Sequence, residues 1–394
     1  MTRLWDKGQP LDERVLGFTA GDDHELDNRL VKHDVAASIA HAEMLNVCGL
    51  LTPADLKSIR DALTAIGEAH TRGEWRVKLE HEDGQTALEN LLTEKIGATG
   101  GRLHAGRSRN DQVLAALRLY MREAVEELRA GVNGVADALD QLIRRDGATP
   151  LPGYTHTQQA MPSSVVLWAG GYAAELRDDA EGLRMALRRI AKNPLGSAAG
   201  YGTPNLPVSR EETRTRLGFA MNQEPVTAVQ LSRGKAEAQL LFEITLVMQD
   251  LGRLAADVVL FYSQEFAFVS LAAEFTTGSS IMPQKRNPDV FELIRGRSAS
   301  AQACLSESLA ITSKLTSGYH RDLQLLKAPL FRGIDQCLET LAILPPALAG
   351  VHFNKDRIKL DPSIHAAAEA NLIVAQEGIP FRDAYRRVAE KYRK

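Results

Sequence analysis

The chain has 394 residues, of which 44% are hydrophobic, and 47 basic against 50 acidic side chains give a net charge of −3. This size suffices for a large core in two or three domains, and the nearly balanced charge argues against a nucleic-acid-binding protein. No hydrophobic run reaches transmembrane length, and residues 1–10 lack the pattern of a signal segment, so no membrane association is expected.

The three cysteines, Cys48, Cys304 and Cys337, lie far apart and lack the spacing of metal ligands. Their odd number argues against a framework of disulfides. We therefore expect each cysteine to be a small buried residue, the protein to hold no metal, and its location to be cytoplasmic.

Helical periodicity dominates the chain. Residues 1–105 are predicted to form short helices, of which "SIAHAEMLNVCGLLT" and "TALENLLTEKIG" are the clearest. Between Asp111 and Asp146, hydrophobic residues recur at steps of three and four from Leu114 to Leu142, which predicts one long helix with a single hydrophobic face.

Three more long helices are predicted over residues 163–191, 234–261 and 289–316, the last preceded by Pro288 at a typical helix start. The joints "LPGYTHTQQAMP" and "NPLGSAAGYGTPNLP" are polar or rich in glycine and proline. No segment shows a convincing strand pattern.

The predicted fold class is therefore all-α, a bundle of long helices. We expect an N-terminal helical domain at 1–105, a central long-helix domain at 106–345, and a short C-terminal helical domain at 346–394 that follows the joint "LPPALAG". A hydrophobic face along a helix about 50 Å long must be covered by other helices, and coverage by further subunits would make a homo-oligomer.

Four segments carry side chains suited to chemistry. The first, "GRLHAGRSRNDQV" at 101–113, places Ser108, Arg109 and Asn110 at the start of a predicted helix. Arginine and a helix N-terminus both favour carboxylates or phosphates, so this is either an anion site or a solvated basic turn in which Asp111 serves the helix start.

The second segment, "PGYTHTQ" at 152–158, holds Thr155 and His156. Histidine suits proton transfer near neutral pH, although a histidine in a loop is often incidental. In the third segment, "GYHRDLQLLK" at 318–327, Tyr319 and Lys327 would share a helix face, with Gln324 beside Lys327; an ordinary polar face is the alternative.

The fourth segment, "FTTGSSIMPQKRNPD" at 275–289, is too polar for a core strand and too often interrupted by proline for a helix interior. It is either a surface loop or a loop that closes over a substrate, with Ser279, Lys285 and Asn287 pointing inward.

Together these segments resemble a known family. "GSSIMPQKRNPD" resembles the signature loop of the fumarase/aspartase superfamily, and the other segments, with "NPLGSAAGYG" and "EFAFV", resemble the argininosuccinate lyases. The resemblance runs from "LWDKG" at Leu4 to "GIPFRDAYR" at 378–386. It implies a homotetramer with shared active sites that splits argininosuccinate into L-arginine and fumarate without a cofactor or metal.

The resemblance also implies residue roles. Ser279 would be the base, held close to an alkoxide by positive charge and loop amides, and Lys285 would stabilise the charge of the intermediate. His156, paired with Glu292, would take part in acid chemistry. The implied substrate-binding residues are Ser108, Arg109, Asn110, Thr155, Arg233, Asn287, Tyr319, Gln324 and Lys327.

Three positions depart from the family pattern. Gln85 stands where a histidine is usual, Asp22 and Asp23 lie about where Ser-Ile is usual, and Gln159 replaces an arginine. The first two leave open how the N-terminal segment contacts the substrate.

Two other interpretations compete with this one. The first is another lyase of the superfamily, such as adenylosuccinate lyase or fumarase, against which the segments holding Arg109 and Lys327 argue. The second is a non-catalytic structural protein on the same scaffold, like the crystallin relatives of the family, against which the presence of Ser279, Lys285 and His156 argues.

Overall fold

A computed structural model describes residues 12–393; the quoted segment "LWDKG" lies outside the described residues. The described chain divides into two compact units. Unit 1 contains residues 12–127, 182–244 and 302–335, and unit 2 contains residues 128–181, 245–301 and 336–393. The three-domain division stays a prediction.

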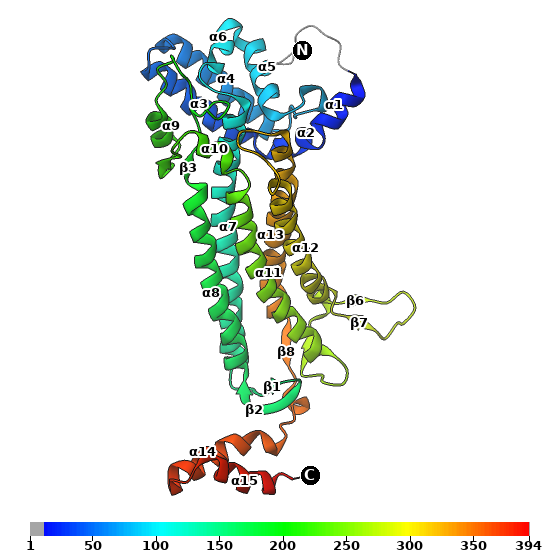
Figure 1. The fold of residues 1–394 in the computed structure, drawn as a ribbon. Helices are drawn as coiled ribbons and strands as arrows, with labels where there is room; N and C mark the ends of the chain where they lie inside the picture. The colour runs from blue at the N-terminus through cyan, green and yellow to red at the C-terminus, as the bar shows by residue number, and fades with distance from the viewer. Residues whose placement is uncertain (1–11, 394) are drawn as a thin grey trace. The chain divides into compact units, whose positions relative to one another are not determined.

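The N-terminal part of unit 1 consists of short helices, as predicted (Figure 1). They are α1 (Glu13–Ala20), α2 (Asp23–Leu26), α3 (Val31–Val47), α4 (Pro53–Thr71), α5 (Gly84–Ile96) and α6 (Ala98–Gly101). The side chains of Asp12, Thr52 and Asp83 accept backbone N–H groups at the starts of α1, α4 and α5. Side chains such as Leu45, Leu63 and Leu92 form a buried core beneath these helices.

The predicted long helices are present, with ends shifted by a few residues. They are α7 (Arg109–Asp146), α8 (Val165–Ile190), α11 (Lys235–Tyr262) and α12 (Asp289–Thr312), and a fifth, α13 (Lys327–Ala349), joins them. Each contributes residues to both units. The hydrophobic face predicted for α7 is buried along its whole length, from Leu114 to Leu142.

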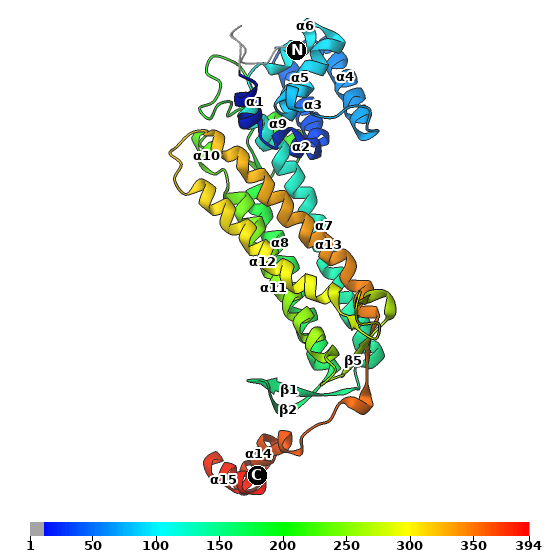
Figure 2. The same ribbon diagram turned by 90° about the vertical axis from the view of Figure 1, so that its right-hand side faces the viewer.

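Within each unit, parts of these helices lie side by side (Figure 2). In unit 1 a Cβ at Gly333 of α13 would lie 2.5 Å from Leu241 of α11, so glycine permits this close approach. In unit 2 a Cβ at Gly131 of α7 would lie 3.0 Å from Leu341 of α13. The bundle therefore depends on small residues where helices meet.

The joint "LPGYTHTQQAMP", expected to lack strands, forms a β-hairpin instead. Strands β1 (Pro150–Thr155) and β2 (Gln158–Ser164) pair antiparallel around the two-residue turn His156–Thr157. Both turn residues have positive φ, 52° and 58°, as in the type I′ turns that match the twist of paired strands. Because each strand is an edge strand, its prolines are tolerated.

Other short strand pairs follow at the joints. They are β3 (Lys192–Asn193) with β4 (Met221–Asn222), β5 (Val269–Leu271) with β8 (Val351–Phe353), and β6 (Thr277–Gly278) with β7 (Arg286–Asn287). Two short helices, α9 (Arg210–Arg216) and α10 (Thr227–Leu231), lie between β3 and α11. The chain remains predominantly helical, which confirms the all-α class.

The segment "LPPALAG" is not a joint, because α13 continues through Pro345 and Pro346 to Ala349. Both prolines lie within the last five residues of the helix, where only the carbonyls of Leu341 and Ala342 lose their usual N–H donors. Beyond it, α14 (Ala366–Glu377) and α15 (Phe381–Lys391) pack together around Ala370, Ala384 and Val388. No helix in the described part of the chain combines the length and hydrophobicity needed to cross a membrane.

Candidate functional site

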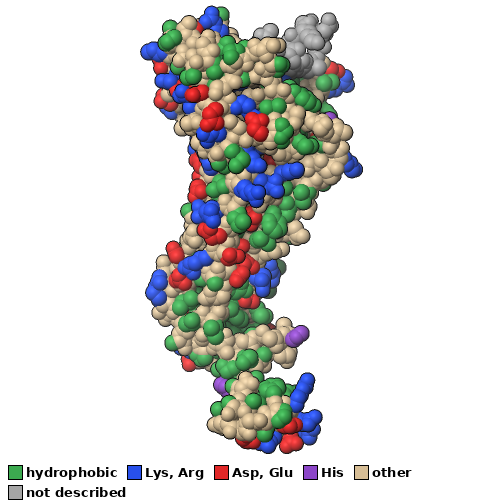
Figure 3. Space-filling model, turned by 60° about the vertical axis from the view of Figure 1, so that its left-hand side comes forward, with side chains coloured by type: hydrophobic (Ala, Val, Ile, Leu, Met, Phe, Trp, Pro, Cys, Tyr) green, Lys and Arg blue, Asp and Glu red, His purple; other side chains and the backbone are tan. Residues whose placement is uncertain are grey.

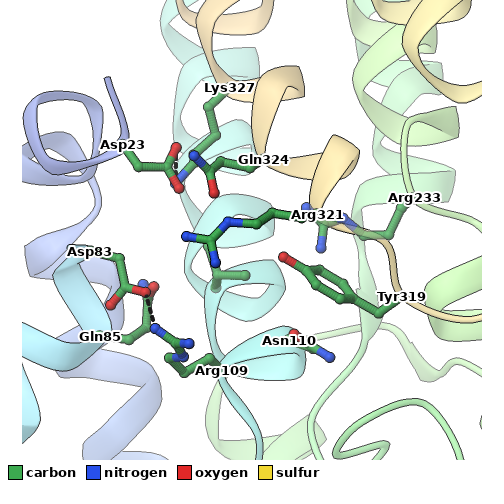
Figure 4. Close-up of a pocket in the computed structure, with 11 residues that line it drawn as sticks. Asp23, Asp83, Gln85, Arg109, Asn110, Arg233, Tyr319, Arg321, Gln324 and Lys327 are labelled. Carbon is green, nitrogen blue, oxygen red and sulfur yellow. Dashed lines mark hydrogen bonds and ion pairs between the residues drawn. The ribbon is translucent and has the colours of Figure 1, made fainter. Parts of the chain in front are cut away.

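Unit 1 contains a cavity of about 110 Å³ lined by polar and charged side chains from five segments (Figure 4). Asp23 comes from α2, and Asp83 and Gln85 come from the start of α5. The remaining lining residues are Arg109, Asn110 and Val113 of α7, Arg233 before α11, and Tyr319, Arg321, Gln324 and Lys327 at and before the start of α13.

The start of α7 is fixed by Asp111. Its Oδ1 accepts the N–H of Ser108 at 2.9 Å, and its Oδ2 accepts the N–H groups of Gly196 and Ala198 at 3.1 and 2.7 Å. Asp111 is completely buried, which raises its pKa to about 6 despite these donors. Asp111 therefore serves the start of α7, as the interpretation of this segment as a basic turn predicted. Asp111 itself is buried, however, and not solvated.

Arg109 is held on one side of the cavity by a carboxylate. Its Nη1 lies 2.6 Å from Oδ2 of Asp83, which also caps α5 through the N–H of Thr86 at 2.7 Å. Burial raises the pKa of Asp83, and the nearby charge of Arg109 opposes that rise. One edge of the guanidinium is thus engaged, while 28% of the side chain stays exposed.

Lys327 lies on the opposite side, between two carboxylates. Its Nζ is 2.5 Å from Oδ1 of Asp27 and 2.9 Å from Oδ1 of Asp23. Asp27 is completely buried and also accepts the N–H of Gly84 at 2.9 Å. Burial opposes the charge on Lys327, but the two carboxylates outweigh it and raise its pKa, so Lys327 stays an ammonium group.

The segment before α13 also binds the end of α1. The Nε2 atom of Gln324 donates to the carbonyls of Thr19 and Ala20, at 3.0 Å each. The Nη2 atom of Arg321 donates to the carbonyl of Thr19 at 2.9 Å and to Oε1 of Glu82 at 2.6 Å. The N-terminal helices therefore form one wall of the cavity.

Six of the expected substrate-binding residues line this one cavity: Arg109, Asn110, Arg233, Tyr319, Gln324 and Lys327. Ser108 directly precedes Arg109 in the chain but does not line the cavity. Tyr319 lies before the helical segment rather than in it, since a 3₁₀-helix covers Arg321–Leu326 and α13 begins at Lys327. The expected site residues of unit 2 come from other segments of the chain than those that line the cavity.

Unit 2 carries its expected site residues on two hairpins and in the first turn of α12. Thr155 and His156 lie at the tip of β1–β2, whereas Ser279, Lys285 and Asn287 belong to the β6–β7 hairpin. Glu292 follows in the first turn of α12. Among the described residues of unit 2, no hydrogen bond or ion pair joins the two hairpins.

The Ser279 hydroxyl sits in a nest of backbone amides. Its Oγ accepts the N–H groups of Met282 at 3.1 Å and Ile281 at 3.4 Å. Amide donors directed at an oxygen favour negative charge on it. The loop thus supplies two amide donors to the Ser279 hydroxyl, and the role of Ser279 as the base stays a prediction.

Four charged or polar residues line the cavity although the sequence did not predict them as site residues: Asp23, Asp83, Gln85 and Arg321. Asp23 and Gln85 were noticeable in the sequence only as departures from the family pattern. Nothing in the sequence distinguished Asp83 or Arg321 from the residues beside them as site residues. In the part of the chain that the structure describes, no group of three or more His, Cys, Asp or Glu residues is placed to hold a metal ion.

Comparisons with known proteins match the chain to lyases. A family model described as "Lyase" matches residues 12–303. An argininosuccinate lyase of Sorangium cellulosum is 45% identical over 98% of this chain and 90% of its own length. One of Thermotoga neapolitana is 42% identical, with 99% and 98% covered.

Solved structures show the same fold. A variant of EDDS lyase with bound fumarate aligns with a TM-score of 0.80 and 25% identity, over 97% of this chain and 76% of its own. The class II fumarase of Schistosoma mansoni, at 18% identity, aligns with a TM-score of 0.80 over 98% and 91%. Because these relatives match it in sequence over nearly its whole length, the chain belongs to the argininosuccinate lyase family.

Proposed function

We propose that the protein cleaves argininosuccinate to L-arginine and fumarate, a step of arginine biosynthesis. The observation that carries the proposal is the cavity of unit 1. It gathers residues that the family resemblance implies for both halves of that molecule: Arg109 and Asn110 for the succinate carboxylates, and Tyr319, Gln324 and Lys327 for the arginine part. Arginine and lysine suit the carboxylates that both ends of this substrate carry.

In the proposed reaction, Ser279 removes a proton from the carbon next to a carboxylate, and the bond from the neighbouring carbon to the guanidino nitrogen breaks. A serine hydroxyl is a weak base, so negative charge on Oγ has to be stabilised. The N–H groups of Ile281 and Met282 are placed to do so. Lys285 and Asn287 bind the charged intermediate, and His156 with Glu292 supplies the proton that the leaving guanidine takes up.

We further propose a cytoplasmic homotetramer in which different subunits complete each active site, with Thr155 and Ser108 among the contacts to the succinate part. Large hydrophobic side chains are exposed on the long helices, among them Leu167 of α8, Phe242 of α11 and Leu293 of α12. Figure 3 shows hydrophobic side chains at the surface between charged ones. Helices of further subunits would cover such residues.

A substrate panel tests the activity. The purified protein is given argininosuccinate, adenylosuccinate or malate, and fumarate is followed by the absorbance of its double bond. We expect fumarate from argininosuccinate alone. Preferred turnover of another compound would assign the protein to a different activity of the superfamily, and no turnover of any would favour the structural role.

The role of Ser279 is tested by Ser279→Ala, with Ser280→Ala as a matched control at the exposed neighbouring hydroxyl. Because the lost group acts mainly in the transition state, we expect turnover to vanish while substrate binding stays largely intact. The control should keep near-normal turnover. Retention of about a tenth of wild-type turnover by Ser279→Ala would rule this serine out as the base.

A further inference from the structure

The C-terminal helices α14 and α15 lie side by side (Figure 1) and leave a groove of about 370 Å³ between them. The groove is lined mainly by small residues of α14 and by aromatic residues at and after α15: Ala366, Ala367, Ala370, Phe381, Tyr385 and Tyr392. Because Phe381 and Tyr385 are 47% and 55% exposed, the groove reaches the surface. Space beside alanines and exposed rings suits an aromatic side chain from a partner.

Positive charge borders this groove. Residues 381–393 carry five cations against two carboxylates, in a chain whose net charge is −3. Three of these cations have carboxylate partners in α14 or α15, at 2.6 to 3.3 Å. The other two, Arg382 and Arg393, directly follow the groove residues Phe381 and Tyr392 and have no carboxylate partner among the described residues. The groove therefore favours an acidic partner.

A complementary surface lies on α1 in unit 1. Phe18 is 89% exposed, more than any other large hydrophobic side chain in the described part of the chain. Val15 precedes Phe18 by three residues, so both lie on one face of the helix, and Val15 is 44% exposed. Residues 12–26 carry five carboxylates against one arginine, and four of these carboxylates are exposed. Helix α1 thus combines an exposed aromatic ring with negative charge.

Each surface lies next to one half of the proposed shared site. In unit 1 the carbonyl of Thr19, at the end of α1, accepts a hydrogen bond at 3.0 Å from Gln324, which lines the cavity with Arg109. In unit 2 Ala160 lines the groove and follows four residues after His156, at most about 14 Å along an extended strand. A site that draws Arg109 from one subunit and His156 from another therefore brings α1 of the first subunit beside the groove of the second.

We propose that α1 of one subunit docks into the groove between α14 and α15 of another, with Phe18 beside Phe381 and Tyr385. This inference rests on the proposed function, because it needs the site that subunits share. Docking buries hydrophobic surface on both subunits and brings the carboxylates of α1 to Arg382 and Arg393, and aromatic and arginine side chains are typical anchors of protein interfaces. The C-terminal helices of one subunit thereby support the cavity wall of its neighbour.

Photo-cross-linking tests this contact in the assembled protein. Phe18 is replaced by the photoreactive residue p-benzoylphenylalanine, and Val47, which is 58% exposed at the end of α3, is replaced in the same way as a control. On illumination we expect the variant at position 18 to form a covalent dimer on a denaturing gel, with the cross-linked peptide found by mass spectrometry within residues 361–393. The variant at position 47 should give no cross-link to those residues.

Two neighbouring alanines show whether the groove receives Phe18. Ala367 and Ala368 are both exposed on α14, but only Ala367 lines the groove. In the variant with p-benzoylphenylalanine at position 18, Ala367→Trp fills the groove and should abolish the cross-link. Ala368→Trp adds the same side chain outside the groove and should leave the yield unchanged. Equal yields from the two tryptophan variants would show that α1 docks elsewhere.

A cross-link within one chain, or to another segment, would overturn the proposal, as would a monomer in native mass spectrometry or an oligomer that forms no cross-link. The substrate panel decides the cleavage activity separately. A protein that cross-links as expected but releases no fumarate from argininosuccinate would contradict only the proposed cleavage. A protein that cleaves argininosuccinate but forms no such cross-link would contradict only the docking of α1.

Discussion

At the scale of single residues, His41 shows how burial fixes a protonation state. Its side chain in α3 is completely buried, and its Nε2 lies 2.8 Å from the carbonyl oxygen of Ala105, to which it donates. Burial lowers the pKa of His41 to about 3, and the positive charge of Arg107 adds to the effect. The ring is therefore neutral in the folded protein at any pH near neutrality.

This depressed pKa predicts a loss of stability in acid. Between about pH 6.5 and 3 the unfolded chain binds a proton at His41 that the folded protein does not, so the contribution is complete above pH 6.5 and is lost as pH falls toward 3. The maximal slope is about 1.4 kcal/mol per pH unit. His41→Gln, which keeps an N–H donor but does not titrate, should lose less free energy of unfolding on acidification.

Urea unfolding at several pH values between about 7.5 and 5 measures the difference, with His352→Gln as a control at an exposed histidine. Asp34 and Asp111, whose burial raises their pKa values to about 6, give a slope of opposite sign, but they are present in all three proteins. Their effect cancels when the proteins are compared. Parallel curves for wild type and His41→Gln would contradict the assignment.

Residues of the cavity could be predicted where their segments were unusual in composition, as with Arg109 and Lys327. Arg321 could not, although it lies between two predicted residues, because its ion pair with Glu82 joins positions 239 residues apart. Asp23 likewise forms its ion pair with Lys327, which lies 304 positions away in the chain. Such partners follow from tertiary packing, which no local pattern in the sequence reveals.

At the scale of elements, the long helices were predictable because a hydrophobic face leaves a repeat of three and four in the sequence. The β1–β2 hairpin was not, since its strands contain prolines, lack alternation, and turn at His156–Thr157 instead of at the usual Asn-Gly. Thr157, a β-branched residue, has φ of 58°, a left-handed conformation that disfavours such side chains. This turn carries the proposed acid residue His156.

The strain at Thr157 predicts that Thr157→Gly stabilises the protein. The left-handed conformation costs a non-glycine residue about 1–2 kcal/mol, and the greater freedom of glycine in the unfolded chain offsets part of the gain, which leaves roughly 0.5–1 kcal/mol. Thr157→Ala keeps the Cβ atom and should gain less. Thermal unfolding of both variants measures the difference, and an equal or larger gain for alanine would show that Cβ strain is not the cause.

At the scale of the whole molecule, the length of α7 limits which residues of one chain can meet at a single site. Its 38 residues from Arg109 to Asp146 make a helix about 57 Å long. His156 lies ten residues after Asp146. Even a fully extended chain of ten residues could lead back from the end of α7 toward its start by at most about 34 Å. One chain therefore keeps Arg109 and His156 at least about 20 Å apart, too far to act on the same small molecule.

If both residues serve one active site, that site must draw them from different subunits, and two inactive variants should restore activity to each other. Arg109→Ala and His156→Ala subunits, each nearly inactive alone, are mixed equally after reversible dissociation. In a random mixture about one site in four receives both intact residues, so activity near a quarter of wild type is expected. A mixture in which native mass spectrometry detects hybrids but activity stays at the level of the separate variants would contradict the shared site, and with it the placement of Arg109 or His156 in that site.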